Sequence, residues 1–267
     1  MKRHKMRFPL VLIGVFSGLA AGIAAQENSS ILAALPDFPA PAAAGQNPAS
    51  HAMPRVDWLY RVKRNIENSR QVAASCQIIF DGDSITDGWQ SRGKKIWAQR
   101  YAKYDAVNFG LGGDRTENLL WRLAQGQAAG LNPKLIVLMI GINNTGGNSI
   151  NKTVPNTPTQ IAEGIGAIIA AYRERCPDAV ILLHGVLPNG EKPSGSRASR
   201  KQMNELIARF ADGNKVIFLD FGDQFLQPDG TISREVLYDF LHPDEKGYQI
   251  WADAIQPLID KYLEGKS

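Results

Sequence analysis

Residues 78–87 read IIFDGDSITD, in which a short apolar run leads directly into acidic, glycine and hydroxyl residues. The apolar run at 78–80 has no polar residue between its members, which is typical of a strand covered on both faces of a parallel sheet. In open α/β sheets, functional loops gather at the carboxyl ends of the strands. We therefore expect reactive residues at 81–87.

Further apolar runs and segments of helical periodicity alternate along the rest of the chain. The runs lie at 106–109, 135–140, 180–183 and 216–219, and the helical segments at 56–70, 116–125, about 159–175, 197–211 and 244–262. Strands that alternate with helices form a parallel sheet with helices on both faces. The sequence predicts a three-layer α/β/α domain with five strands.

Composition agrees with one domain of this kind and argues against nucleic-acid binding. The chain has 267 residues, 44% of them hydrophobic, which suits one domain with additional terminal segments. Its net charge of +4 comes from 30 Lys and Arg against 26 Asp and Glu, and four of the basic residues precede residue 8. The body of the chain has no stripe of basic residues interleaved with aromatic ones, so we expect no nucleic-acid partner.

The first residues have the pattern of an export signal. Basic residues at 2–7, an apolar run at 8–23 and small residues at 24–25 predict a signal peptide over 1–25 and a secreted or periplasmic protein. An uncleaved membrane anchor stays an alternative, because the apolar run is only a little short of the ~20 residues that span a bilayer. Residues 26–55 are rich in Ala, Pro, Ser and Asn, which predicts a linker or N-terminal arm before a domain at 56–267.

The chain has two cysteines, Cys76 and Cys176, and each lies just before a predicted strand. An oxidising compartment would allow them to form a disulfide. Two buried thiols fit the sequence equally well.

Acyl transfer by a serine needs an adjacent base and a third group that orients the base. His242 follows Asp239 by one turn of chain, so the carboxylate and the imidazole can meet, and we predict Ser84 as nucleophile, His242 as base and Asp239 as orienting group. The alternatives are His184 as base, a residue that also fits a core position at a strand end, or a solvated Asp239 beside a helix-capping His242.

The negative charge that develops on the carbonyl oxygen needs preorganised hydrogen-bond donors. Gly113 precedes DRTE at 114–117, the pattern of a capping box, which predicts that its amide lies at the start of a helix. Asn143 follows the run at 135–140 and offers a side-chain N–H. A tight turn with positive φ at Gly113, and a turn role for Asn143, are the alternative interpretations.

These candidates fall into four blocks: GDS at 82–84, NFGLGGD at 108–114, GINN at 141–144 and DFLH at 239–242. The blocks and their order resemble the SGNH/GDSL hydrolases. More narrowly, 108–123 and 141–144 resemble the catalytic subunits of intracellular platelet-activating-factor acetylhydrolase and similar secreted bacterial esterases. One departure is Asn144, where many family members have Asp, although the acetylhydrolase branch also has Asn.

The resemblance, which extends over about 58–262, implies a flavodoxin-like sheet and an esterase that needs neither a metal nor a cofactor. It also implies an oxyanion hole made by the backbone amides of Ser84 and Gly113 and the side chain of Asn143. The expected substrates are short-chain, above all acetyl, esters of carbohydrate or lipid. We expect no stable membrane span after signal cleavage, and a homodimer is compatible with the sequence.

Two other classes of function start from the same residues. The stretch at 78–87 also resembles the first motif of haloacid-dehalogenase-type phosphatases, in which Asp81 would be the nucleophile of a Mg²⁺-dependent reaction. Against this, Ser84 replaces the usual Gly, and no convincing downstream Lys and acidic pair follows. A catalytically inactive module that binds glycan or lipid would keep the fold without the chemistry.

Overall fold

Five parallel strands form one sheet in the part of the chain that the structure describes. The computed structural model describes residues 39–72, 75–147 and 153–265. The strand order is β2-β1-β3-β4-β5, the flavodoxin-like arrangement. The strand bounds are Ile78–Gly82 for β1, Val107–Asn108 for β2, Leu135–Met139 for β3, Val180–His184 for β4 and Val216–Leu219 for β5. The predicted α/β fold is confirmed.

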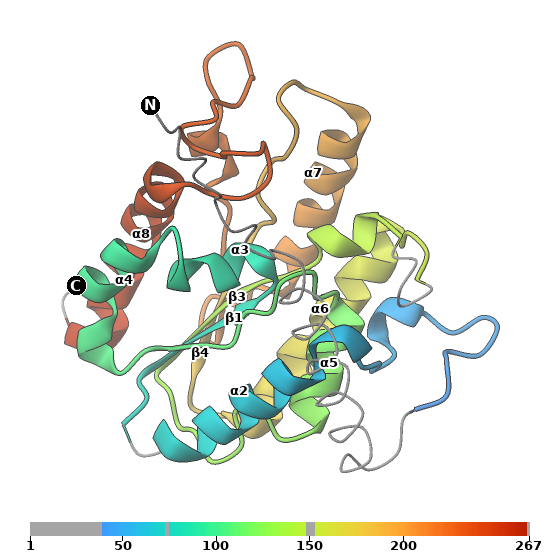
Figure 1. The fold of residues 1–267 in the computed structure, drawn as a ribbon, viewed down its shortest axis with the longest axis vertical. Helices are drawn as coiled ribbons and strands as arrows, with labels where there is room; N and C mark the ends of the chain where they lie inside the picture. Colours follow the sequence, from blue (N-terminus) through green and yellow to red (C-terminus); the bar gives the residue numbers. More distant parts are fainter. Residues whose placement is uncertain (1–38, 73–74, 148–152, 266–267) are drawn as a thin grey trace, which may run out of the picture.

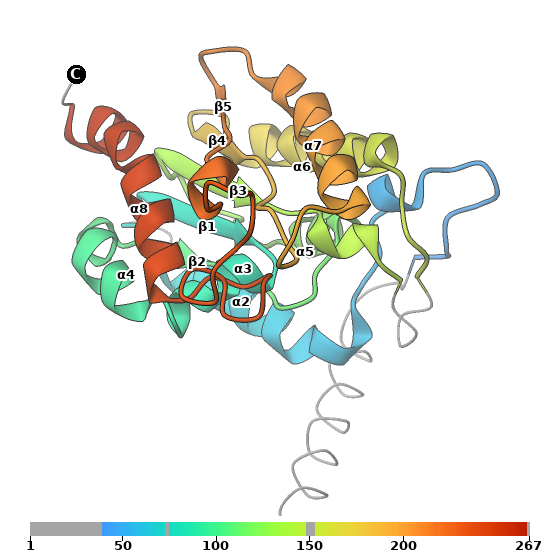
Figure 2. The same cartoon turned by 90° about the horizontal axis from the view of Figure 1, so that it is seen from above.

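Helices cover both faces of the sheet, as Figures 1 and 2 show. On one face α4 lies beside α8, and on the other α6 lies between α5 and α7. The helix bounds are Leu59–Val72 for α2, Lys94–Arg100 for α4, Thr116–Ala124 for α5, Pro158–Arg175 for α6, Gly195–Ile207 for α7 and Glu245–Ile259 for α8. Every residue of β1, β3 and β4 is buried, which explains why these runs lack the polar alternation of a half-exposed strand.

The predicted helices are present, but their ends differ from the sequence pattern. The segment predicted at 56–70 begins as a 3₁₀ turn, Val56–Trp58, before α2. The segment predicted at 197–211 leaves the α-helical conformation after Ile207, and the last helix continues beyond α8 as a π-helical turn, Asp260–Glu264. The periodicity of the sequence missed α4, which has seven residues. So short a helix offers few turns for a period to show.

Residues 47–55, within the segment predicted as a linker or arm, pack closely on the body. Ala49 is fully buried, and its carbonyl accepts a hydrogen bond from Thr116 Oγ1 at 2.6 Å. The Met53 amide donates to the Glu117 carbonyl at 3.0 Å, and Asn118 Nδ2 donates to the Met53 carbonyl at 3.0 Å. This arm is therefore anchored to the first turn of α5.

The sequence left open whether the two cysteines form a disulfide. Cys76 and Cys176 are both buried free thiols, so the structure has no bridge between them. Burial raises the pKa of the Cys76 thiol to about 12 and that of Cys176 to about 11.

The predicted signal peptide lies outside the described residues. Among the helices of the described ranges, none combines the length and apolar character required to cross a bilayer.

Candidate active site

Ser84 lies where β1 ends and the short helix α3, Ser84–Asp87, begins. Asp83 caps this helix, since its Oδ1 accepts a hydrogen bond from the Ile85 amide at 2.9 Å. Gly82 permits the close approach of β1 to the end of β3, because a Cβ at this position would overlap the Met139 carbonyl. The strand, the glycine and the cap together hold Ser84 at the carboxyl edge of the sheet.

The structure brings Ser84, His242 and Asp239 into one hydrogen-bonded chain. Ser84 Oγ lies 2.8 Å from His242 Nε2, and His242 Nδ1 lies 2.7 Å from Asp239 Oδ2. The nucleophile candidate and the base candidate are 158 positions apart in the sequence. The arrangement is that of a hydroxyl, a base and an orienting carboxylate.

Asp239 is fixed by the loop that carries it. Its Oδ1 accepts hydrogen bonds from the amides of Leu241 at 3.1 Å and His242 at 2.7 Å, while Phe240 between them has a positive φ of 63°. Partial burial pushes the pKa of Asp239 upward, but the hydrogen bonds and the charge of His242 outweigh it and lower the pKa. The N-cap of α8 is Asp244, so His242 is not a helix cap.

Among the described residues, the backbone amides of Ser84 and Gly113 donate to no acceptor. Gly112 lies against Ser84, because a Cβ on Gly112 would be 3.8 Å from Ser84 Cβ. Asn143 Nδ2 donates one hydrogen to the Asp114 carbonyl at 2.9 Å, which leaves its second N–H available. All three predicted donors therefore keep an N–H that no acceptor in the described part of the chain occupies.

The capping box predicted at 114–117 is wrong. The N-cap of α5 is Arg115, whose amide donates to Asn118 Oδ1 at 3.0 Å. Asp114 is instead buried and accepts a hydrogen bond from Arg122 Nε at 2.7 Å, because the buried guanidinium requires a counter-charge. Gly113 thus lies before the helix start, in a tight turn with φ 78°.

Asn144 connects the loop after β3 to the start of α5. Its Oδ1 accepts a hydrogen bond from the Thr116 amide at 2.9 Å, and its Nδ2 donates to Glu117 Oε2 at 2.9 Å. An ionised Asp has no N–H to donate to Glu117, so the amide is the side chain that satisfies both contacts. This position therefore holds the neighbouring Asn143 in place.

Asp81 belongs to a buried network and is not accessible. It accepts hydrogen bonds from Arg122 Nη2 at 3.0 Å, Gln127 Nε2 at 2.7 Å and the Tyr172 hydroxyl. The described residues also contain no group of three or more His, Cys, Asp or Glu placed to hold a metal ion. The phosphatase alternative, with Asp81 as nucleophile, is therefore not favoured.

His184 is a core residue rather than a base. It packs edge-on against Phe221 and Trp251, with ring centroids 5.1 and 5.6 Å apart. Burial lowers the pKa of His184 to about 3, so the ring stays neutral. His242, unlike His184, makes a hydrogen bond with Ser84.

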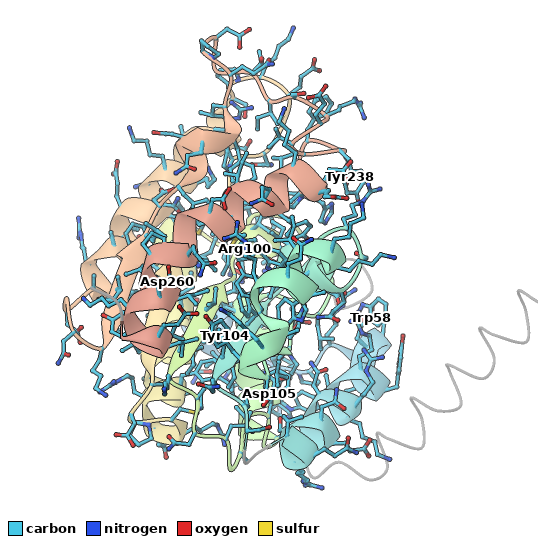
Figure 3. The ribbon with its side chains drawn as sticks, turned by 90° about the vertical axis from the view of Figure 1, so that its left-hand side faces the viewer. Trp58, Arg100, Tyr104, Asp105, Tyr238 and Asp260 are labelled. Atoms are coloured by element: carbon cyan, nitrogen blue, oxygen red, sulfur yellow. The ribbon has the colours of Figure 1, made fainter. Side chains whose placement is uncertain are left out.

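A pocket of about 270 Å³ opens beside Ser84 and His242. Tyr238 forms one wall, where its ring stacks on His242 at a centroid distance of 6.0 Å, and the Arg92 guanidinium lies 3.6 Å from the centre of the Tyr238 ring. Figure 3 shows Tyr238 beside the N-terminal end of α8, with Asp260 at the other end. Sequence reasoning had no reason to single out Arg92.

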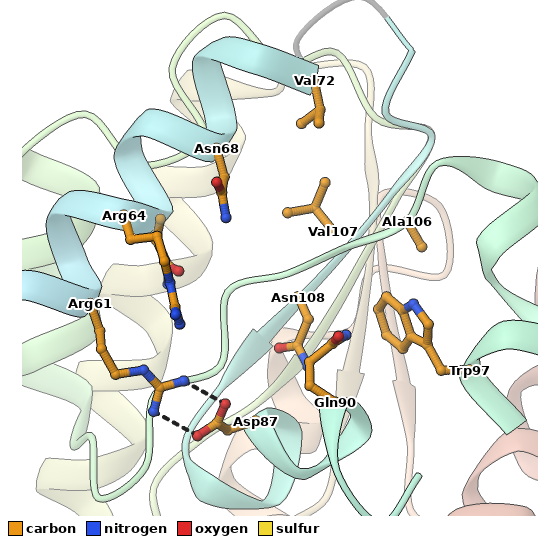
Figure 4. A pocket seen from close by; sticks show the side chains of 11 residues that line it. Arg61, Arg64, Asn68, Val72, Asp87, Gln90, Trp97, Ala106, Val107 and Asn108 are labelled. Atoms are coloured by element: carbon orange, nitrogen blue, oxygen red, sulfur yellow. Dashed lines mark hydrogen bonds and ion pairs between the residues drawn. The ribbon is translucent and has the colours of Figure 1, made fainter. Parts of the chain in front are cut away.

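A second pocket, of about 480 Å³, lies between α2 and the edge strand β2. Asp87 and Gln90 line both pockets. Arg61 forms an ion pair with Asp87, with nitrogen–oxygen distances of 2.6 and 2.8 Å (Figure 4). This ion pair lies in the wall that the two pockets share.

Comparison with known proteins identifies the class to which this fold and site belong. The model of the GDSL-like Lipase/Acylhydrolase family matches residues 80–250. The chain therefore belongs to this family and is a carboxylic ester hydrolase.

Several individual proteins are similar to the chain. It is 33% identical over 225 residues to human platelet-activating factor acetylhydrolase IB subunit alpha1, covering 82% of this chain and 92% of that one. It is 35% identical over 188 residues to the rat subunit alpha2, covering 70% and 77%. Among solved structures, a GDSL-like lipase from Bacteroides thetaiotaomicron is similar in fold, with a TM-score of 0.62 and 20% identity over 76% of this chain and 98% of that one. An acetyl xylan esterase also shares the fold, with a TM-score of 0.57 and 22% identity over 68% and 99%.

Proposed function

We propose that this protein hydrolyses short-chain, above all acetyl, esters of carbohydrate or lipid alcohols, with Ser84 as nucleophile. The observation that carries the proposal is the continuous hydrogen-bonded chain from Ser84 Oγ through His242 to Asp239, with contacts of 2.8 and 2.7 Å. Such a chain allows a hydroxyl to lose its proton as it attacks a carbonyl carbon.

In the first half of the proposed reaction, His242 takes the Ser84 proton while Oγ attacks the ester carbonyl. The oxyanion accepts hydrogen bonds from the free amides of Ser84 and Gly113 and from Asn143 Nδ2. Asp239 stays ionised and stabilises the imidazolium. His242 then gives the proton to the leaving alcohol. In the second half His242 takes a proton from a water molecule that attacks the acyl carbon, and returns it to Ser84 Oγ as the acid leaves.

The preference for short acyl groups is supported by the size of the pocket and by the relatives. The space beside Ser84 is about 270 Å³, which is below the roughly 300–1,000 Å³ of common ligand pockets. Relatives and fold neighbours are named as an acetylhydrolase and an acetyl xylan esterase. One fold neighbour is named a GDSL-like lipase and another an acetyl xylan esterase, which supports lipid and carbohydrate esters as candidate substrates.

The test combines a substrate panel with active-site labelling. In a series of p-nitrophenyl esters with acyl chains of two to twelve carbons, we expect the acetate to have the highest kcat/KM. Acetylated sugars are the next substrates to assay. A fluorophosphonate should label the wild type and Ser196→Ala, an exposed control serine, but not Ser84→Ala. Faster cleavage of the long chains would overturn the substrate preference, and absence of labelling in the wild type would support the inactive binding module.

We also propose that the protein is exported. Support comes from the basic, apolar and small-residue regions of residues 2–25. Sequencing the N-terminus of protein recovered from the periplasm or medium should find a start near Gln26. Recovery of the protein in the membrane fraction with residues 1–25 still attached would support the anchor instead.

A further inference from the structure

Arg55, the last residue of the arm, reaches the glycine turn beside the nucleophile. Its Nη1 donates a hydrogen bond to the Gly112 carbonyl. The remainder of the guanidinium is fixed by Asp57, whose carboxylate accepts from Nε at 3.0 Å and from Nη2 at 2.8 Å. The Trp58 ring lies below it, with its centre 5.6 Å from Cζ. The side chain is only 12% exposed, so the cation is held in one place.

The peptide bond between Gly112 and Gly113 joins this contact to the proposed oxyanion hole. In a planar trans peptide the carbonyl of one residue and the amide of the next point in opposite directions, and the described chain has no cis peptide bonds. An arginine that holds the Gly112 carbonyl therefore also fixes the direction of the Gly113 N–H, which points away from the guanidinium.

The surroundings of the two glycines show which side each contact occupies. A Cβ on Gly112 would lie 3.8 Å from Ser84 Cβ, whereas a Cβ on Gly113 would overlap the Arg55 guanidinium. The turn therefore lies between the nucleophile and the arginine. The Gly113 amide has no acceptor among the described residues, so it stays available on the side away from Arg55.

We propose that Arg55 is a positioning residue for the oxyanion hole, which aims the Gly113 amide at the substrate by binding the carbonyl of the same peptide unit. The proposal rests on the proposed function of Gly113 as a donor. The positive charge adds a second effect, because a hydrogen bond to a carbonyl polarises the peptide and strengthens its N–H as a donor. The catalytic turn is then completed by a residue outside the four sequence blocks.

The variants Arg55→Gln and Arg55→Lys test this role, with Arg100→Gln as the matched control. Arg100 is also an ion-paired arginine, held by Asp253 at 2.9 Å on the contact between α4 and α8 (Figure 3). For Arg55→Gln we expect kcat to fall roughly 10–100-fold, since a misplaced donor loses much of its effect, and KM to change less than about threefold. Arg55→Lys, which retains the charge, should recover part of the loss.

A second readout separates positioning from a general loss of structure. A trifluoromethyl ketone forms a tetrahedral adduct with Ser84, whose oxyanion occupies the hole. Its inhibition constant should rise in Arg55→Gln by about the same factor as kcat/KM falls, as expected for lost transition-state binding. Thermal unfolding of Arg55→Gln and Arg100→Gln should shift by similar amounts, and Arg100→Gln should keep wild-type kcat.

The outcomes distinguish this proposal from the proposed function. If Ser84→Ala abolishes activity while Arg55→Gln retains kcat within about twofold, the positioning role is wrong and the serine mechanism stands. A fall in kcat without weaker binding of the ketone would also overturn it. If Ser84→Ala is as active as the wild type, the proposed function itself fails, whatever Arg55 does.

Discussion

The turn after β1 and the loop at 237–243 supply the two halves of the proposed catalytic chain, yet they are held in place by different forces. The turn that carries Ser84 rests on a buried charge network. Its members Asp81, Asp114 and Arg122 have side-chain exposures of 0%, 1% and 1%. Asp239 and His242 are 40% and 26% exposed, and the contacts that fix them come mainly from their own loop. The first region depends on buried charge and the second on local hydrogen bonds.

This difference separates stability from catalysis. A change in the buried network leaves an uncompensated charge in the interior, which costs folding free energy. A change in the exposed loop leaves the core intact and alters only the orientation and charge of His242, the proposed base.

Asp239→Asn should have the largest effect and should act on catalysis alone. The amide can present an N–H to His242 Nδ1 and favour the wrong tautomer, so we expect kcat to fall about 10³–10⁴-fold, or about 4–5.5 kcal/mol. Because Asp239 is exposed, the urea midpoint should stay close to that of the wild type. A large drop in stability would contradict the separation of the two regions.

Arg122→Met should have the next largest effect and should act on stability. It leaves Asp81 and Asp114 buried without their cation, so we expect a loss of about 3–5 kcal/mol in the free energy of unfolding. Tyr172→Phe removes one hydrogen bond to Asp81 and should cost only about 1–3 kcal/mol. Both values follow from urea titrations, and equal losses in the two variants would contradict a charge-based network.

The pH dependence of stability should reveal Asp83. Burial raises its pKa from 3.8 to about 7, so the folded protein binds more protons than the unfolded chain between these values. Stability should therefore rise as the pH falls from about 8 to 5. The pKa of Asp239 is lowered in the folded protein, so its carboxylate stabilises the fold at neutral pH. That contribution is lost only at a pH below 3.8, as the pH falls through the pKa of Asp239 in the folded protein.

Asp83→Asn isolates this effect, because Asn keeps an oxygen for the cap on the Ile85 amide and does not titrate. At pH 8 the variant should be more stable than the wild type, on the order of 1–4 kcal/mol, and its stability should change less with pH. Urea titrations at both pH values provide the measurement. An unchanged slope with pH would assign the dependence to another group, such as Asp114, whose pKa burial raises to about 6.

Arg92→Ala should have the smallest effect. It removes a cation over the Tyr238 ring and an ion pair with Asp244 at 3.1 Å, both at the surface. We expect the free energy of unfolding to fall by less than about 1 kcal/mol, since exposed ion pairs contribute little to stability. A loss as large as that of Arg122→Met would mean that the exposed loop is not held by its own bonds.

Sequence patterns predicted the parts of the fold that depend on continuous apolar runs. The strands at 78–82 and 135–139 are buried on both faces, and such strands need no distant information to be recognised. The short helix α4 escaped prediction because its seven residues offer few turns for a period to show, and the role of Asp114 escaped it for another reason. Asp114 binds a guanidinium from the next helix, and no local pattern distinguishes that partner from a helix cap.

The candidate site shows the same limit. The motif order brought Ser84, Gly113, Asn143, Asp239 and His242 to attention, and the structure places the Ser84, His242 and Asp239 side chains in contact. Arg55 escaped because it lies in a stretch whose composition predicts a linker. Its significance depends on the packing of the arm on α5, a contact between residues far apart in the chain.

The anchored arm has a practical consequence for anyone who wishes to shorten this protein. A gene fragment cut to the span that the family model matches, 80–250, would lack α2, residues 47–55 and the end of α8. Removing residues 47–55 would leave Thr116 Oγ1 and Asn118 Nδ2 without their carbonyl acceptors. It would also uncover the apolar cluster on which Ala52 packs, and exposed apolar surface favours aggregation. Fragments for crystallisation or display should therefore begin ahead of Asn47.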